Sequence, residues 1–121
     1  LRRQRQMCIR DSRKTHQMSF KNSSDYLREI EQDINEGCDA VIVKPALSYL
    51  DVISKVKDRF SIPIIGYCVS GVYSMIKSAS KENLIQEIDV TMEILFSIKR
   101  AGATAIITYS AIEIARKLNK E

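Results

Sequence analysis

The chain has 121 residues, 45% of them apolar, with a formal net charge of +4 and 3 cysteines. No apolar run approaches the roughly 20 residues of a membrane-spanning helix, which argues against an integral membrane protein. The cysteines form no CxxC pair, which argues against a disulfide framework or a zinc site and favours a reducing, cytoplasmic setting.

The first twelve residues, LRRQRQMCIRDS, differ in origin from the rest of the chain. They match one reading frame of a transposase-type sequencing-library adapter, so we interpret residues 1–12 as a translated artefact. The alternative is a basic arm for nucleic acid or a membrane, or a targeting peptide. Without the four arginines and one aspartate of this segment, 15 basic and 14 acidic residues remain, a net charge of +1. The charge therefore predicts no nucleic-acid or membrane partner.

A polar loop and then a helix are predicted at the start of the remaining chain. Arg13–Met18 is polar and irregular, as loops are. Leu27, Ile30 and Ile34 follow at helical spacing, and Gly37 is a typical residue to end that helix.

The next predicted element is a short strand that ends in a lysine. Ala40–Val43 is continuously apolar, which predicts a strand buried on both faces. Pro45 stops the strand and holds Lys44 at the corner between a buried layer and a loop. Desolvation disfavours an ammonium there, and a neutral amine is the nucleophile that Schiff-base chemistry requires. The alternative is a lysine whose stem packs while its head reaches solvent.

The remaining elements alternate between helices and strands. Ile62–Val69 and Ala105–Thr108 read as two further strands, and they are followed by Ser70 and Tyr109. Helical patterns follow the strands. Two apolar stripes define the longer helices: Leu50, Ile53, Val56 and Phe60 in the first, and Leu84, Ile88, Met92, Leu95 and Ile98 in the second, where Met92 is expected in the core.

This alternation predicts an α/β fold with a parallel sheet. Three strands alone would leave both sheet edges open, so we interpret residues 13–121 as the last three βα units of a TIM (β/α)8 barrel. The first five strands would then be missing. The carboxyl ends of barrel strands carry the chemistry, and Lys44, Ser70 and Tyr109 all stand at such ends.

Three segments carry a family resemblance: VKPALSYLD at Val43–Asp51, YCVSGVYSMIK at Tyr67–Lys77, and SIKRAGATAIITYS at Ser97–Ser110. In this order and spacing the chain resembles porphobilinogen synthase (5-aminolevulinate dehydratase) from Arg13 to about Leu118. The resemblance implies a C-terminal portion of that family's single TIM-barrel domain. It also implies a hydro-lyase of tetrapyrrole biosynthesis that joins two 5-aminolevulinate molecules into porphobilinogen, as a cytoplasmic homo-octamer.

The resemblance also implies the roles of the site residues. Lys44 would form a Schiff base with one 5-aminolevulinate, and Ser70 and Tyr109 would bind the carboxylate of that substrate. Arg13 and Gln17 would bind the second substrate. A partner lysine and the segment that binds the catalytic metal would lie outside this chain, so magnesium and zinc both stay open as cofactors.

Further positions concern regulation and departures from the family. Glu29 matches a glutamate that, in some bacterial members, binds an allosteric magnesium at a subunit contact; a solvated helix glutamate is the alternative. Cys68 and Val72 stand where the family usually has glutamine and glutamate. Losing this polar pair beside the pocket would weaken activity; lineage drift and sequencing errors are the alternatives.

Two other functions stay open on the residues alone. One is a different Schiff-base barrel enzyme, such as a class I aldolase, although the segment GATAII at 102–107 is not a phosphate-binding glycine loop. The other is a non-catalytic βα module that binds a partner. We expect the 121-residue chain by itself to be inactive.

Overall fold

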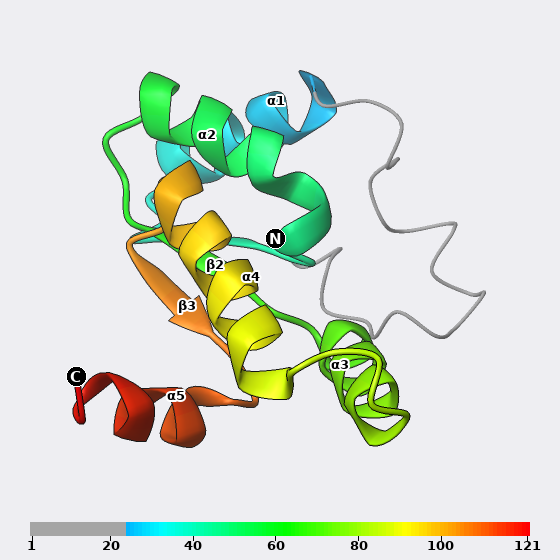
Figure 1. Cartoon of the computed structure of the whole chain (residues 1–121). Helices are drawn as coiled ribbons and strands as arrows, with labels where there is room; N and C mark the ends of the chain where they lie inside the picture. The colour runs from blue at the N-terminus through cyan, green and yellow to red at the C-terminus, as the bar shows by residue number, and fades with distance from the viewer. Residues whose placement is uncertain (1–23) are drawn as a thin grey trace.

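Strands and helices alternate along the described part of the chain. The computed structural model describes residues 24–121, and Figure 1 shows helices packed over the sheet and beyond one of its ends. In chain order the elements are α1 (Ser24–Asn35), β1 (Val41–Val43), η3 (Leu47–Tyr49), α2 (Leu50–Arg59), β2 (Ile64–Tyr67), α3 (Ser70–Lys81), α4 (Glu87–Ala101), β3 (Ala105–Ile107) and α5 (Ala111–Leu118). Within this part, none of the helices has the length and apolar character that a bilayer crossing requires.

The three strands form one parallel sheet in the order β1-β2-β3. In one row across the three strands, Val43 of β1 lies opposite Gly66 of β2, which lies opposite Ile106 of β3. Parallel neighbours need a crossover connection, which α2 supplies between β1 and β2 and which α3 and α4 supply between β2 and β3. The predicted α/β class and the three predicted strands are confirmed, although each strand is shorter than its apolar run.

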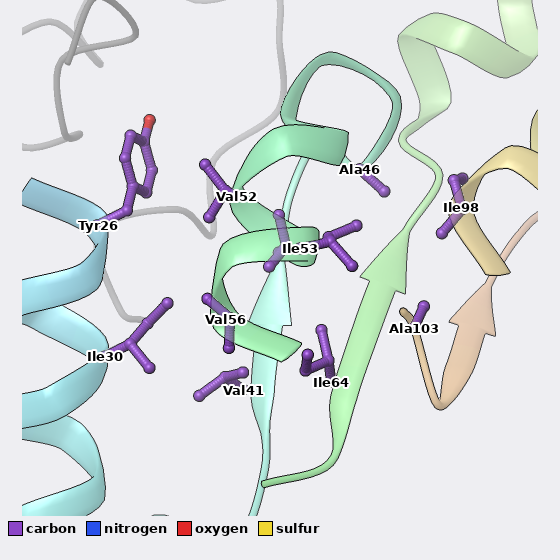
Figure 2. Packing of buried hydrophobic residues seen from close by; sticks show 11 residues of the cluster. Tyr26, Ile30, Val41, Ala46, Val52, Ile53, Val56, Ile64, Ile98 and Ala103 are labelled. Atoms are coloured by element: carbon purple, nitrogen blue, oxygen red, sulfur yellow. The ribbon is translucent and has the colours of Figure 1, made fainter. Parts of the chain in front are cut away.

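A main core of buried apolar residues lies between the sheet and helices α1, α2 and α4. Its members are Tyr26, Ile30, Val41, Val43, Ala46, Val52, Ile53, Val56, Ile64, Ile98 and Ala103. Figure 2 shows the α2 side chains Ile53 and Val56 directed at the strands that carry Val41 and Ile64. Each such side chain stabilises the fold by roughly 1.5–3 kcal/mol relative to an exposed one. The predicted apolar stripes of α1 and α2 are confirmed.

The opposite face of the sheet is open. Ile42 on β1 is 39% exposed and Ile107 on β3 is 42% exposed. The prediction that Ala40–Val43 is buried on both faces is therefore wrong for the part of the chain described. Successive side chains of a strand point to opposite faces, and the helices within residues 24–121 cover only one of them. A closed barrel would turn the open face inwards and bury it.

Helix α4 starts later than its sequence pattern predicts. Leu84 lies before the helix and is 76% exposed, so it is not part of a buried stripe. The buried residues of α4 are Thr91 and Ile98. Met92 and Leu95 instead line an apolar groove between α4, β3 and α5, so the prediction that Met92 belongs to the core is wrong.

A second, small core lies beneath α3, separate from the main core. It consists of Cys68, Val69, Val72 and Ile76. Figure 1 shows α3 and α5 beyond the end of the sheet to which the strand arrows point. The carboxyl end of the sheet is therefore framed by these two helices.

Candidate functional site

Lys44 is the first residue after β1, at the carboxyl edge of the sheet. Val43 pairs with Gly66, so Lys44 comes level with Tyr67, the last residue of β2. The Lys44 Nζ atom lies 4.9 Å from the centroid of the Tyr67 ring. An ammonium at this distance from an aromatic face is held by cation–π attraction. The lysine side chain is therefore anchored by a residue of the neighbouring strand.

Tyr67 also contacts Tyr109, the second residue beyond the end of β3. Tyr67 pairs with Ile107, so its side chain points to the same, open face of the sheet as that of Ile107, which is 42% exposed. The Tyr67 and Tyr109 side chains share a hydrogen bond, which is the largest of the causes that raise the pKa of Tyr67. Partial desolvation raises it further. Tyr109 itself is 53% exposed and is open to a ligand.

Ser70 is the first residue of α3, three residues after the end of β2. The first backbone hydrogen bond of this helix runs from Tyr73 N to Val69 O over 3.2 Å. The amino end of a helix is the positive end of its dipole, and it favours a carboxylate. Ser70 thus lies where a hydroxyl group and the helix dipole can act on the same anion.

The structure brings some predicted site residues together and leaves others apart. Lys44 and Tyr109 are joined through Tyr67, which the sequence interpretation missed. Strand register could have found Tyr67, since it is the last residue of the strand between Lys44 and Tyr109. The predicted sites at Arg13 and Gln17, like the interpretation of residues 1–12, lie outside the described residues.

Glu29 lies in α1, which precedes β1 in the chain. No group of three acidic, histidine or cysteine residues that could hold a metal ion occurs within residues 24–121. These residues therefore do not fit a complete metal site, and we derive no catalytic step through a metal.

Cys68 and Val72, the two departures from the resembled family, are both buried in the small core. Burial raises the pKa of the Cys68 thiol, which keeps it protonated. Tyr67 and Leu47 pack against the same cluster. An apolar pair therefore fills the space beneath the site.

The comparisons with known proteins agree on one family. The family model for delta-aminolevulinic acid dehydratase matches residues 3–117. Delta-aminolevulinic acid dehydratase of Staphylococcus aureus strain Mu50 is 53% identical over 108 residues, which are 89% of this chain and 33% of the relative. The Staphylococcus epidermidis protein of the same name is 52% identical over 108 residues, with the same coverage.

A solved structure agrees as well. The crystal structure of delta-aminolevulinic acid dehydratase (porphobilinogen synthase) from Toxoplasma gondii ME49, in complex with the reaction product porphobilinogen, matches with a TM-score of 0.84 and 45% sequence identity. The match covers 86% of this chain and 30% of that chain. The chain spans about a third of the length of the curated relatives it matches. The predicted architecture, βα units from the C-terminal part of a TIM barrel, is thereby confirmed. Because the family model matches residues 3–117, the chain belongs to the delta-aminolevulinic acid dehydratase family.

Proposed function

We propose that this chain forms the C-terminal part of a porphobilinogen synthase, a hydro-lyase that condenses two 5-aminolevulinate molecules into porphobilinogen. The observation that carries the proposal is the row formed by Lys44, Tyr67 and Tyr109 along the carboxyl edge of the sheet. The row combines an amine with phenol groups, which suits a ketone substrate that also bears a carboxylate. The relative from Toxoplasma gondii, solved with porphobilinogen, supports the same reaction.

In this proposal Lys44 is the nucleophile. Its amine adds to the ketone carbon of one 5-aminolevulinate, water leaves, and the resulting imine holds the substrate covalently. The contact with Tyr67 holds the side chain near the edge of the sheet while it is an ammonium, and loss of a proton from Nζ then gives the neutral amine that attacks the ketone.

Ser70 and Tyr109 bind the carboxylate of that same substrate. In this proposal Tyr109 accepts the hydrogen bond that it shares with Tyr67 and donates its own O–H to the carboxylate. An accepted hydrogen bond polarises a hydroxyl group and makes it a stronger donor. The dipole of α3 adds a favourable field at Ser70.

The remaining roles concern parts outside the described site. Arg13 and Gln17 bind the second 5-aminolevulinate, and Glu29 contributes to an allosteric magnesium site at a subunit contact. The complete enzyme is a cytoplasmic homo-octamer that uses magnesium or zinc, held by a segment outside residues 24–121. Two free cysteines in the described chain, Cys38 and Cys68, support a reducing compartment.

A fusion enzyme tests the proposal. Residues 13–121 are joined to the upstream part of the Staphylococcus aureus relative, which is 53% identical to this chain where the two overlap. Borohydride treatment with 5-aminolevulinate should trap substrate on Lys44, located by peptide mass spectrometry, because reduction turns an imine into a stable amine.

Two variants complete the test. Lys44→Met should abolish both trapping and synthesis of the pyrrole, whereas Lys81→Met, at an exposed lysine at the end of α3, should keep both. A Lys44→Met fusion enzyme that still makes porphobilinogen would refute the proposed function. A folded fusion enzyme that makes none would contradict it as well.

A further inference from the structure

One face of α3 connects the two proposed carboxylate-binding residues. Ser70, Tyr73 and Lys77 stand at positions i, i+3 and i+7 of this helix, so they share one side of it. The Tyr73 ring packs against the Tyr109 ring with 5.5 Å between centroids and an interplanar angle of 41°. Tyr73 therefore bridges the gap between the helix that carries Ser70 and the strand end that carries Tyr109.

Tyr73 is itself held from its other side. The Lys77 Nζ atom lies 5.3 Å from the centroid of the Tyr73 ring. Lys77 forms a salt bridge with Glu87, the first residue of α4. A chain of contacts thus runs from Tyr109 through Tyr73 and Lys77 to α4, a second helix that packs on the sheet.

Tyr109 has few constraints apart from these contacts. It lies beyond the end of β3, it is 53% exposed, and it precedes the first residue of α5 by only two positions. The hydrogen bond with Tyr67 fixes its hydroxyl end, but one hydrogen bond leaves the ring free to turn about it. A second ring packed against the Tyr109 ring removes that freedom.

We propose that Tyr73 is a positioning residue for Tyr109: its ring holds the Tyr109 ring in the orientation that aims the hydroxyl group at the substrate carboxylate, and Lys77 with Glu87 holds Tyr73 in place. Tyr73 acts through its ring and needs no hydroxyl group for this role. The inference rests on the proposed function, in which Tyr109 binds that carboxylate.

The experiment measures kcat and KM for 5-aminolevulinate in the fusion enzyme, together with the melting temperature. Tyr73→Leu removes the ring but keeps an apolar side chain, and it should raise KM about threefold to tenfold with little change in kcat, as expected for one lost aromatic pair. Tyr73→Phe keeps the ring and should leave KM within about twofold of the parent.

A double-mutant cycle separates positioning from packing. Tyr109→Phe removes the hydroxyl group, and it should raise KM roughly tenfold to a hundredfold as a charge-assisted hydrogen bond is lost. In that background Tyr73→Leu should have little further effect on KM, because no hydroxyl group remains to be aimed. Additive effects, or a lowered melting temperature with an unchanged KM, would overturn the inference.

A matched aromatic pair provides the control. Tyr26 and Tyr49 pack with 5.2 Å between ring centroids at 46°, a geometry close to that of Tyr73 and Tyr109. Tyr26→Leu should lower the melting temperature and leave KM unchanged. If it raises KM as much as Tyr73→Leu does, the effect is one of general stability and the inference is wrong.

Two further outcomes are distinguishable. An unchanged KM in Tyr109→Phe would refute the proposed carboxylate site itself, whereas a raised KM there with an unchanged KM in Tyr73→Leu would overturn only the positioning role. If Tyr73→Leu does not fold, Lys77→Met replaces it. A rise in KM of about twofold to fivefold then supports the role, and an unchanged KM overturns it.

Discussion

Gly66, at the centre of the sheet, should not tolerate even a methyl group. A Cβ atom built on Gly66 would lie 2.5 Å from Ile98 Cγ2 and 3.4 Å from Ala46 Cβ. Carbon atoms in contact normally lie about 3.5–4.0 Å apart, so Ile98 would have to retreat by about 1 Å. Ile98 is fully buried on α4 and has no space to retreat into without moving the helix.

The expected cost follows from this geometry. Overpacking of a well-packed core costs about 1–3 kcal/mol, and we expect Gly66→Ala to lower the free energy of unfolding by that amount. Denaturant unfolding of the fusion enzyme, followed by circular dichroism, measures it. Shortening Ile98 to Ala removes the clashing atom, so the double variant should be less destabilised than the two single changes combined.

Gly37 provides the control because its constraint is of a different kind. Nothing lies within 4 Å of a Cβ atom built there, but its φ of +93° is unfavourable for any residue with a side chain. Gly37→Ala should therefore destabilise by about 1 kcal/mol, and Ile98→Ala should not relieve that loss. Strict additivity of Gly66→Ala and Ile98→Ala, or a Gly66→Ala variant as stable as the parent, would refute the packing argument.

Two further predictions follow from burial. Val72→Glu restores the residue usual in the family but places a carboxylate in the small core, so it should destabilise the fusion enzyme by about 1–3 kcal/mol in thermal unfolding. Adding Cys68→Gln should recover part of that loss, because the amide supplies a hydrogen-bond partner for the carboxylate. An unchanged melting temperature in Val72→Glu would show that the carboxylate reaches solvent. The 121-residue chain expressed alone should aggregate or stay partly unfolded and make no porphobilinogen, since Ile42 and Ile107 leave an apolar sheet face exposed. Pyrrole synthesis by this chain alone would contradict that expectation.

The elements that sequence could predict are those fixed by local rules. The apolar run before Pro45 marks the end of β1, and with it the position of Lys44 at the carboxyl edge of the sheet. The stripe of α2 was equally clear, because Ile53 and Val56 repeat at helical spacing. The position of Tyr109 after a strand followed in the same way.

What sequence could not predict depends on contacts between elements. The sequence placed Tyr67 in a strand and Tyr73 in a helix without assigning either a role, and their roles appear only when register and packing bring their rings to Lys44 and Tyr109. The prediction of where α4 starts was wrong for a similar reason, because Leu84 is apolar but no neighbouring side chain covers it. The roles of Arg13 and Gln17 stay predictions, and so does the metal role of Glu29.

The division of the interior into a main core and a small core has a consequence for how the molecule opens. Lys44 follows a strand fixed by the main core, whereas Ser70 and Tyr73 belong to the helix that rests on the small core. Segments with fewer buried contacts open more often, so amide hydrogens of α3 should exchange with solvent faster than those of α2. Opening of α3 would release the carboxylate of a bound molecule while the lysine stays in place. In the proposed enzyme, the carboxylate end of the substrate would therefore leave before the end that Lys44 holds as an imine.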